Sequence, residues 1–314
     1  MTQPTEPSDV TSRLVGRIRG SGPGPMLLIV GGLHGNEPEG IAAMRAVAAE
    51  LAACESGIRG DVVMLAGNLR ALGLGRRFLE SDLNRCWSPE RVASLSAGRA
   101  DAANGPEDIE QSGLSSALAE ALKRARGRVH VVDLHSTSAD GVPFVMCPDR
   151  EGDRALARLV PLPLVLGLLE TVEQTLAMYL ANRGCLVLAV EGGPRGRTAS
   201  IANLEAVLWL VLAGTRIVDD GVARNLETHR ARLERARGDL PRAIRVHHRQ
   251  AADRRGGFCL EPDFANIQRV KEGQLLARHA GGEFRAPADG YMLLPSYQEQ
   301  GDDGFFLGTE IQDR

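Results

Sequence analysis

The feature that most constrains this chain is a repeated alternation of short apolar runs with longer runs of helical spacing. Runs of strand length occupy residues 26–30, 61–66, 129–134 and 185–190, and helical runs occupy residues 41–51, 109–126 and 199–213. Such alternation is typical of a largely parallel sheet with helices on both faces. We therefore predict an α/β domain over residues 13–238, preceded by a flexible tail at residues 1–12.

After Pro241 the pattern changes to short alternating segments separated by Gly, Pro and Asp. The segments lie at residues 243–248, 257–261, 274–278, 290–294 and 305–311. This spacing favours strands, so we predict a small all-β domain over residues 239–314. Within the α/β part we also expect an edge strand at 13–19, strands at 143–147 and 163–167, a loop at 67–90 and a helix at 171–182.

Composition narrows the classes of function. The net charge of −3 and pI of about 6.2 suggest neither a nucleic-acid partner nor a membrane surface. The five cysteines have no CxxC spacing, which favours free thiols in a reducing compartment. The polar N-terminus shows no signal peptide and no apolar run reaches membrane-spanning length, so we expect a cytoplasmic protein. Almost all basic residues are arginine, and Ala and Gly are abundant. This composition is typical of a GC-rich, bacterial genome.

Residues 31–40, GGLHGNEPEG, form the stretch with the clearest chemistry. They lie between an expected strand and an expected helix, where glycines let the backbone bend and approach a ligand. His34 and Glu37, three residues apart on this turn, can point at one spot and hold a zinc ion. The alternative is a capped helix start with a solvated histidine and a first-turn glutamate favoured by the helix dipole.

Polar residues also follow two other expected strands. His135 follows the run at 129–134, and Glu191 follows the run at 185–190. Ligands of open α/β sheets gather at the carboxyl ends of the strands, and a catalytic zinc usually has three protein ligands. His34, Glu37 and His135 would supply that set, leaving Glu191 to act as a base. His130 begins its strand, at the wrong edge, and the remaining histidines are expected to be structural or on the surface.

The expected loop at 67–90 is rich in arginine and contains the run Asp82–Trp87, DLNRCW. Arg85 could hold a substrate carboxylate through two hydrogen bonds, and Asn84 could add an amide donor. Arg77 could reach a developing oxyanion. Asp82 could accept a hydrogen bond from the far nitrogen of a ligating histidine. The alternative is a surface loop with a structural ion pair.

The motifs GGLHGNE, DLNR, DLHST and VEGGP, in this order, resemble those of the succinylglutamate desuccinylase and aspartoacylase family of zinc carboxypeptidase-like proteins. The resemblance implies a zinc-carboxypeptidase-like catalytic domain with a β-rich C-terminal extension and one zinc per chain. By motif, it implies the following roles: zinc ligands His34, Glu37 and His135; catalytic Glu191; Arg77 for the tetrahedral intermediate; substrate-binding Asn84 and Arg85; and Asp82 as the partner of the first histidine. Tyr297 is the position that matches a family tyrosine reaching into the site.

Two positions depart from the aspartoacylase pattern. Ala181 stands where a second substrate-binding arginine is expected, and Ala177 replaces a tyrosine, while Arg183 is displaced by two residues. The function we expect is a zinc-dependent amidohydrolase acting on a small N-acyl amino acid of acetyl or succinyl type. Alternatives are a carboxypeptidase on short peptides, a deacylase or esterase of another ligand, and a catalytically silent carboxylate-binding domain. The acyl group, the amino acid and a homo-oligomeric state are left open.

Overall fold

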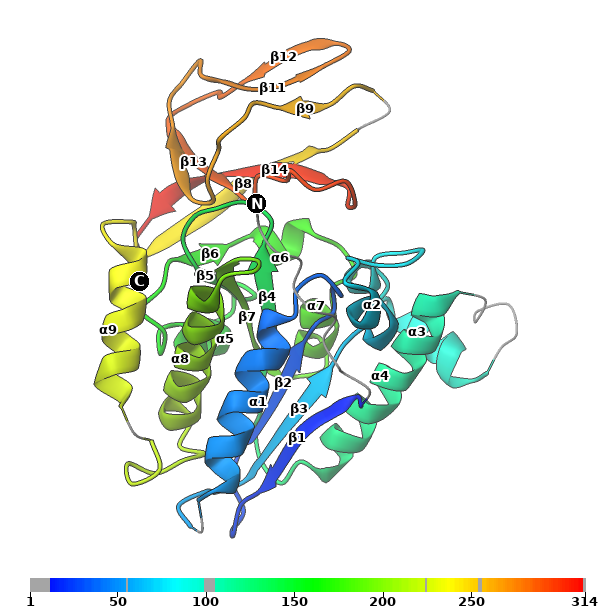
Figure 1. Ribbon diagram of the computed structural model, residues 1–314, viewed down its shortest axis with the longest axis vertical. Helices are drawn as coiled ribbons and strands as arrows, with labels where there is room; N and C mark the ends of the chain where they lie inside the picture. The colour runs from blue at the N-terminus through cyan, green and yellow to red at the C-terminus, as the bar shows by residue number, and fades with distance from the viewer. Residues whose placement is uncertain (1–11, 55, 99–104, 224, 254–255, 313–314) are drawn as a thin grey trace.

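The computed structural model describes residues 12–54, 56–98, 105–223, 225–253 and 256–312, and within them eleven strands form one continuous sheet (Figure 1). In the order in which they lie side by side, the strands are β1 (Leu14–Arg19), β3 (Asp61–Ala66), β2 (Met26–Gly31), β4 (Val129–Thr137), β7 (Leu186–Pro194), β5 (Phe144–Met146), β6 (Leu164–Leu166), β8 (Ala243–Ala251), β14 (Asp303–Ile311), β13 (Gly290–Leu293) and β10 (Gln268–Val270). Strands β3, β2, β4 and β7 are parallel, and β1 pairs antiparallel at the edge. The predicted α/β class is confirmed.

Strand β2 is buried on both faces, which explains its unbroken apolar sequence. Leu27 and Ile29 belong to one core cluster, and Leu28 and Val30 belong to a second cluster on the other face. Helices α1 (Glu39–Ala52) and α8 (Thr198–Gly214) contribute to the first cluster, and α4 (Pro106–Arg124) and α7 (Leu176–Ala181) contribute to the second. Burying each such side chain stabilises the fold by about 1.5–3 kcal/mol. Helix α9 (Leu226–Arg237) packs on α8.

The predicted loop at residues 67–90 was wrong in part. It contains α2 (Leu69–Leu74), the 3₁₀ turn η1 (Leu83–Arg85) and the start of α3 (Pro89–Ser96). The Asn68 side chain accepts a hydrogen bond from the Ala71 backbone N–H, and Gly75 ends α2 with φ +60°. Helix α2, between this cap and this glycine, is too short for an apolar periodicity to be recognised in the sequence.

The predicted helix at residues 171–182 is divided. Helix α6 (Leu168–Thr171) ends before α7 begins, because Thr175 caps α7 by accepting from the Met178 N–H. Helix α5 (Glu151–Ala157) and the strands β10 and β12 (Gly282–Arg285) were not predicted. All are short, so they carry little periodic signal. Within the described residues, no helix combines the length and the apolarity needed to cross a bilayer.

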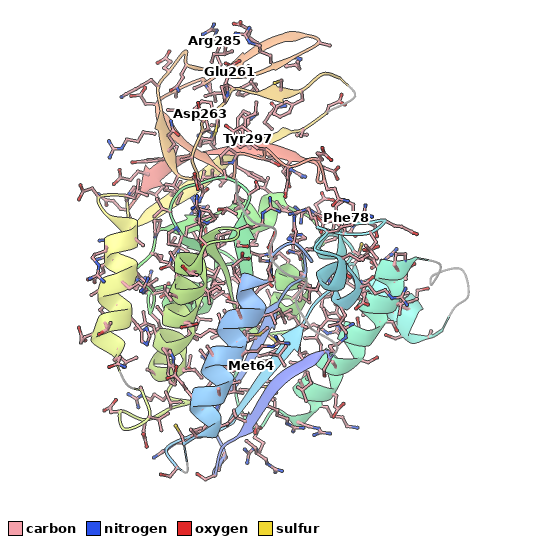
Figure 2. The ribbon with its side chains drawn as sticks, in the orientation of Figure 1. Met64, Phe78, Glu261, Asp263, Arg285 and Tyr297 are labelled. Atoms are coloured by element: carbon pink, nitrogen blue, oxygen red, sulfur yellow. The ribbon has the colours of Figure 1, made fainter. Side chains whose placement is uncertain are left out.

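The chain after residue 242 is built of strands, and it continues the central sheet. Strand β8 pairs in parallel with β6, with Leu164 opposite Ala243. A second sheet, β12–β11–β9, with β11 at Leu275–His279 and β9 at Cys259–Leu260, lies above it. A small third core cluster contains residues of both sheets. Glu261, Asp263 and Tyr297 lie in this region (Figure 2). A separate domain over 239–314 stays a prediction, and the tail predicted at 1–12 falls, apart from Ser12, outside the described residues.

The register of β4 and β7 positions the candidate site. His135 lies opposite Glu191, and Asp133 lies opposite Ala189. Because side chains alternate along a strand, these four project from the same face of the sheet. That face belongs to the second core cluster, so Asp133, His135 and Glu191 stand toward the carboxyl ends of an otherwise apolar surface.

Candidate metal centre and active site

The turn between β2 and α1 is shaped by close backbone contacts. A Cβ atom added to Gly35 would lie 2.0 Å from the carbonyl carbon of Ala71 in α2, so no larger residue fits there. Gly32 has φ +70°, a conformation that favours glycine. The Glu37 N–H donates to the His34 carbonyl oxygen at 3.1 Å, which closes the turn.

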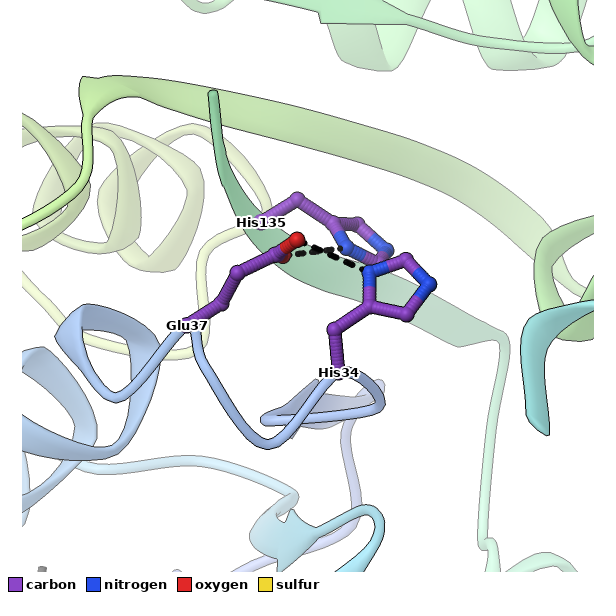
Figure 3. Close-up of side chains that lie close together, drawn as sticks. All are labelled: His34, Glu37 and His135. Atoms are coloured by element: carbon purple, nitrogen blue, oxygen red, sulfur yellow. Dashed lines mark hydrogen bonds and ion pairs between the residues drawn. The ribbon is translucent and has the colours of Figure 1, made fainter. Parts of the chain in front are cut away.

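Glu37 lies between two histidines (Figure 3). Its Oε1 is 2.9 Å from Nδ1 of His34, and its Oε2 is 3.0 Å from Nδ1 of His135. All three side chains are buried, and one ligand atom from each lies within 4.8 Å of the others. Two imidazole nitrogens and a carboxylate form a donor set that suits a divalent transition metal. The structure therefore brings the three predicted ligands together.

A carboxylate supports each histidine from behind. Asp82 Oδ1 is 3.1 Å from Nε2 of His34, and Asp133 Oδ2 is 3.2 Å from Nε2 of His135. The hydrogen bond between Asp82 and Nε2 of His34 selects the tautomer whose Nδ1 lone pair is available to a metal. Asp133 is at ion-pair distance from His135 without the geometry of a hydrogen bond, and its negative charge favours a proton on Nε2 of that ring. Asp82 was predicted in this role. Asp133 was not, although its position two residues before His135, on the same face of β4, was the available signal.

Opposite charges maintain this cluster against the effect of burial. Burial alone would raise the pKa of Glu37, but His34 and His135 lower it well below its usual value. Burial would likewise lower the pKa of His135, but Asp133 and Glu37 raise it well above its usual value. In the metal-free chain the histidine therefore tends to carry a proton, and a bound cation would replace that proton.

Glu191 lies near the carboxyl end of β7 beside His135 and is 8% exposed. Burial raises the pKa of its carboxyl to about 8, with His135 acting against the shift and Glu37 adding to it. Its Oε2 has no hydrogen-bond partner among the described residues. A carboxyl group whose pKa lies near neutrality can both accept and donate a proton. The arrangement is compatible with the predicted role as a base.

One buried carboxylate fixes the loop that carries Arg77 and Asp82. Arg77 Nη2 donates to Asp82 Oδ2 at 3.0 Å, and its Nη1 lies 3.5 Å from Glu37 Oε1. Glu107 of α4, 1% exposed, accepts hydrogen bonds from the backbone N–H groups of residues 79–81. Sequence reasoning missed Glu107, because no local pattern reveals a contact between a helix and a distant loop.

Asn84 and Arg85 have structural partners as well as a place beside the cavity. The Leu176 N–H donates to Asn84 Oδ1 at 2.9 Å, which joins η1 to α7. Arg85 Nη2 donates to Asp303 Oδ2 at 2.9 Å, and Arg249 Nε donates to the other oxygen of Asp303 at 2.6 Å. Arg85 is therefore linked to the C-terminal strands.

The structure does not bring Tyr297 to the cluster. Its hydroxyl donates to the Glu261 carbonyl oxygen at 2.8 Å and accepts from the Phe264 N–H at 2.9 Å. The side chain is 44% exposed and is not among the described residues that line the cavity. Arg183 is also elsewhere, with its Cζ 4.7 Å from the centre of the Tyr179 ring. A place for either residue in the site is therefore without support from these contacts.

A cavity opens over the carboxyl ends of the strands. Residues from 294 to 306, between β13 and β14 and at the start of β14, close its other side. Asp82 contacts Nε2 of His34 and is not among the described residues that line the cavity. The predicted site residues that line the cavity are His34, Glu37, Arg77, Asn84, Arg85, His135 and Glu191.

Comparison with known proteins identifies relatives. The model of the succinylglutamate desuccinylase/aspartoacylase catalytic domain matches residues 23–208. A probable aspartoacylase from Prochlorococcus marinus is 32% identical over 175 residues, which cover 54% of each chain, so the match spans about half of that relative. A succinylglutamate desuccinylase from Pseudomonas paraeruginosa is 27% identical over 280 residues, covering 82% of this chain and 74% of the relative.

A solved structure supports the fold. The crystal structure of a succinylglutamate desuccinylase/aspartoacylase from Rhodobacter sphaeroides matches with a TM-score of 0.69 and 20% identity, covering 95% of this chain and 88% of that one. The family match runs from just before β2 to within α8 and so includes every strand end and turn that supplies the cluster. The chain belongs to the succinylglutamate desuccinylase/aspartoacylase family.

Proposed function

We propose that this protein is a zinc-dependent amidohydrolase that removes an acyl group, of acetyl or succinyl type, from a small N-acyl amino acid. The observation that carries the proposal is the position of Glu37 between Nδ1 of His34 and Nδ1 of His135, with Glu191 beside them in one cavity. Family membership supports it, since the relatives are named as a desuccinylase and an aspartoacylase.

His34, Glu37 and His135 would hold one zinc ion per chain. The fit rests on the donor types and on Asp82 and Asp133, which leave both Nδ1 atoms turned toward Glu37. When bound, zinc supplies Lewis acidity, which polarises a carbonyl group and makes water more acidic.

The chain's own residues would carry the proton and fix the substrate. Glu191 would take a proton from the attacking water and deliver it to the leaving amine, a role worth about 10²- to 10⁴-fold in rate. Arg77, beside Glu37 in the cavity, would stabilise the developing oxyanion. Arg85 and Asn84 would orient the substrate carboxylate. The products would be a carboxylic acid and a free amino acid.

Two alternatives fit less well. A carboxypeptidase would need room for a peptide, whereas residues 294–306 close one side of the cavity. A silent carboxylate-binding domain would not need Glu191, a buried carboxylate with an oxygen lacking a partner in the described chain. The proposal includes a reducing, cytoplasmic setting, which the five free thiols support.

The test is a hydrolysis screen with zinc-loaded protein on N-acetyl and N-succinyl amino acids, with short peptides as comparators. We expect release of the free amino acid from at least one N-acyl amino acid, loss of that activity after metal removal, and its return on adding zinc. Faster cleavage of peptides than of every N-acyl amino acid would favour the carboxypeptidase alternative. No hydrolysis of either class would contradict the proposal.

A further inference from the structure

The wall of the cavity beyond Glu191 is apolar except for Thr175, whose hydroxyl is used to cap α7. Strand β5 follows β7 in the sheet, and Met146 of β5 lies opposite Ala189 of β7. Around them the lining continues with side chains from α6, from the segment after it, from α7 and from β14. These are Leu168, Leu169, Val172, Ala177 and Phe306, all buried and all part of the second core cluster.

The cations of the cavity already have carboxylate partners. Among the described residues, the arginines in its lining are Arg77 and Arg85. Arg77 is paired with Asp82 at 3.0 Å, and Arg85 is paired with Asp303 at 2.9 Å. Asp302 and Asp303 add negative charge on the side formed by the C-terminal region. A substrate carboxylate would share Arg85, and a second carboxylate would meet no further arginine.

The position where the family pattern has a second substrate arginine offers no replacement. Ala177 is in the apolar wall, and Ala181 is buried but does not line the cavity in the described structure. Arg183 stacks on Tyr179 outside the lining. Burying a carboxylate without a partner is strongly unfavourable, whereas an apolar group gains from leaving water.

We propose that the substrate carries a single carboxylate and, facing Met146 and Val172, an uncharged apolar group. This inference rests on the proposed function and narrows it: both the acyl group and the amino-acid side chain are uncharged, and at least one of them is apolar. It separates this chain from the substrates with two or three carboxylates that are implied by the names of its relatives. The apolar group can be contributed by either half of the molecule, so the test has an arm for each.

The first measurement compares pairs of nearly equal shape. N-acetylleucine against N-acetylaspartate tests the side chain, and N-(4-methylpentanoyl)alanine against N-succinylalanine tests the acyl group. We expect the uncharged member of at least one pair to be favoured by about 30-fold or more in kcat/KM, within the range that apolar pockets support. The succinyl and aspartate compounds should both be the poorer members of their pairs. A dicarboxylic compound that equals or exceeds its uncharged partner would overturn the inference, even though the proposed function would stand.

Binding separates this inference from catalysis. The same pairs are measured by calorimetry on the metal-loaded Glu191→Gln variant, which should bind without turnover. If the wild type hydrolyses none of the compounds, the proposed function fails, and the binding preference still decides the substrate class. Equal binding of both members in both pairs would contradict an apolar subsite.

A substitution in the apolar wall should change the preference between charged and uncharged substrates. Val172→Arg adds a cation to the apolar wall, so we expect N-acetylaspartate or N-succinylalanine to gain about tenfold or more relative to its uncharged partner. Gln174→Arg is the matched control, because it adds the same charge at an exposed neighbour outside the lining. A preference unchanged by Val172→Arg in folded protein would argue that the group does not face this wall. If that variant does not fold, the binding comparison still tests the inference.

Discussion

The two sides of the cavity differ in how their side chains are held. On the side of β2, β4 and β7, the strand ends set the positions, and each histidine has its own carboxylate partner. On the side of residues 294–306, contacts between residues far apart in the sequence hold the side chains in place. Asp303 binds both Arg85 and Arg249, and Gln300 Nε2 donates to the Phe78 carbonyl oxygen at 3.1 Å.

This difference suggests that one side of the cavity serves metal binding and catalysis and the other serves substrate binding. The metal-ligand candidates and Glu191 on the strand-end side are buried, so a change there should remove metal binding or catalysis. The ion pair between Arg85 and Asp303 is partly exposed, with side chains 27% and 18% accessible. Such pairs contribute only about 0–1 kcal/mol to stability. A change on that side should therefore alter substrate binding and leave the metal in place.

The largest effect is expected from the ligands. His34→Ala or His135→Ala should reduce zinc from about one per chain to almost none, because the remaining two ligands cannot form a catalytic zinc site. Elemental analysis after dialysis measures this, with His279→Ala as a control histidine in the distant β11 strand. Full zinc in both ligand variants would show that the metal is held elsewhere.

The second effect separates catalysis from binding on the same side. Glu191→Gln should keep its zinc and lose about 10²- to 10⁴-fold in turnover, the usual scale for a general base. The amide keeps the shape of the side chain but cannot take the proton. Turnover near that of the wild type, with zinc retained, would remove Glu191 from the mechanism.

The third effect tests the other side of the cavity. Arg85→Ala should lower kcat/KM for an N-acyl amino acid by roughly 30- to several thousand-fold, the equivalent of about 2–5 kcal/mol for a lost charge-paired contact. Partial exposure of Arg85 favours the lower end. The carboxamide analogue of the substrate should be poor with the wild type and almost indifferent to the change.

Arg249 provides the matched control for Arg85. It binds the other oxygen of Asp303 but does not line the cavity in the described structure. Arg249→Ala should therefore leave the ratio of the acid and carboxamide substrates close to that of the wild type. Equal losses on both substrates in Arg85→Ala would show that Arg85 holds the loop and binds no carboxylate.

The same division explains what the sequence could predict. His135 and Glu191 each follow directly after an apolar run, and His34 lies in the turn after another, so their common edge could be predicted from strand periodicity. The contact of Arg85 with Asp303 joins residues 218 positions apart, and nothing in local spacing indicates it. The predicted role of Tyr297 was based on a loose motif match. In the structure its hydroxyl instead forms hydrogen bonds with the backbone of Glu261 and Phe264.

The smallest effect concerns Asp133, which sequence reasoning overlooked. It is 1% exposed, and its position 3.2 Å from Nε2 of His135 would hold that ring with Nδ1 toward the metal. Loss of such a partner typically costs about 10- to 100-fold in metal affinity or activity. We expect Asp133→Asn near the lower end, because the amide oxygen still accepts a hydrogen bond, and Asp133→Ala near the upper end.

A competition titration with a zinc chelator measures the affinity, and thermal unfolding of the metal-free protein reports any purely structural damage. Asp61→Asn is the control: this buried aspartate begins β3 and pairs with Arg126, away from the cavity. It should change unfolding more than zinc affinity, whereas the Asp133 variants should do the reverse. If Asp133→Ala bound zinc as tightly as the wild type, His135 would not depend on this carboxylate, and the register of β4 alone would orient the ring.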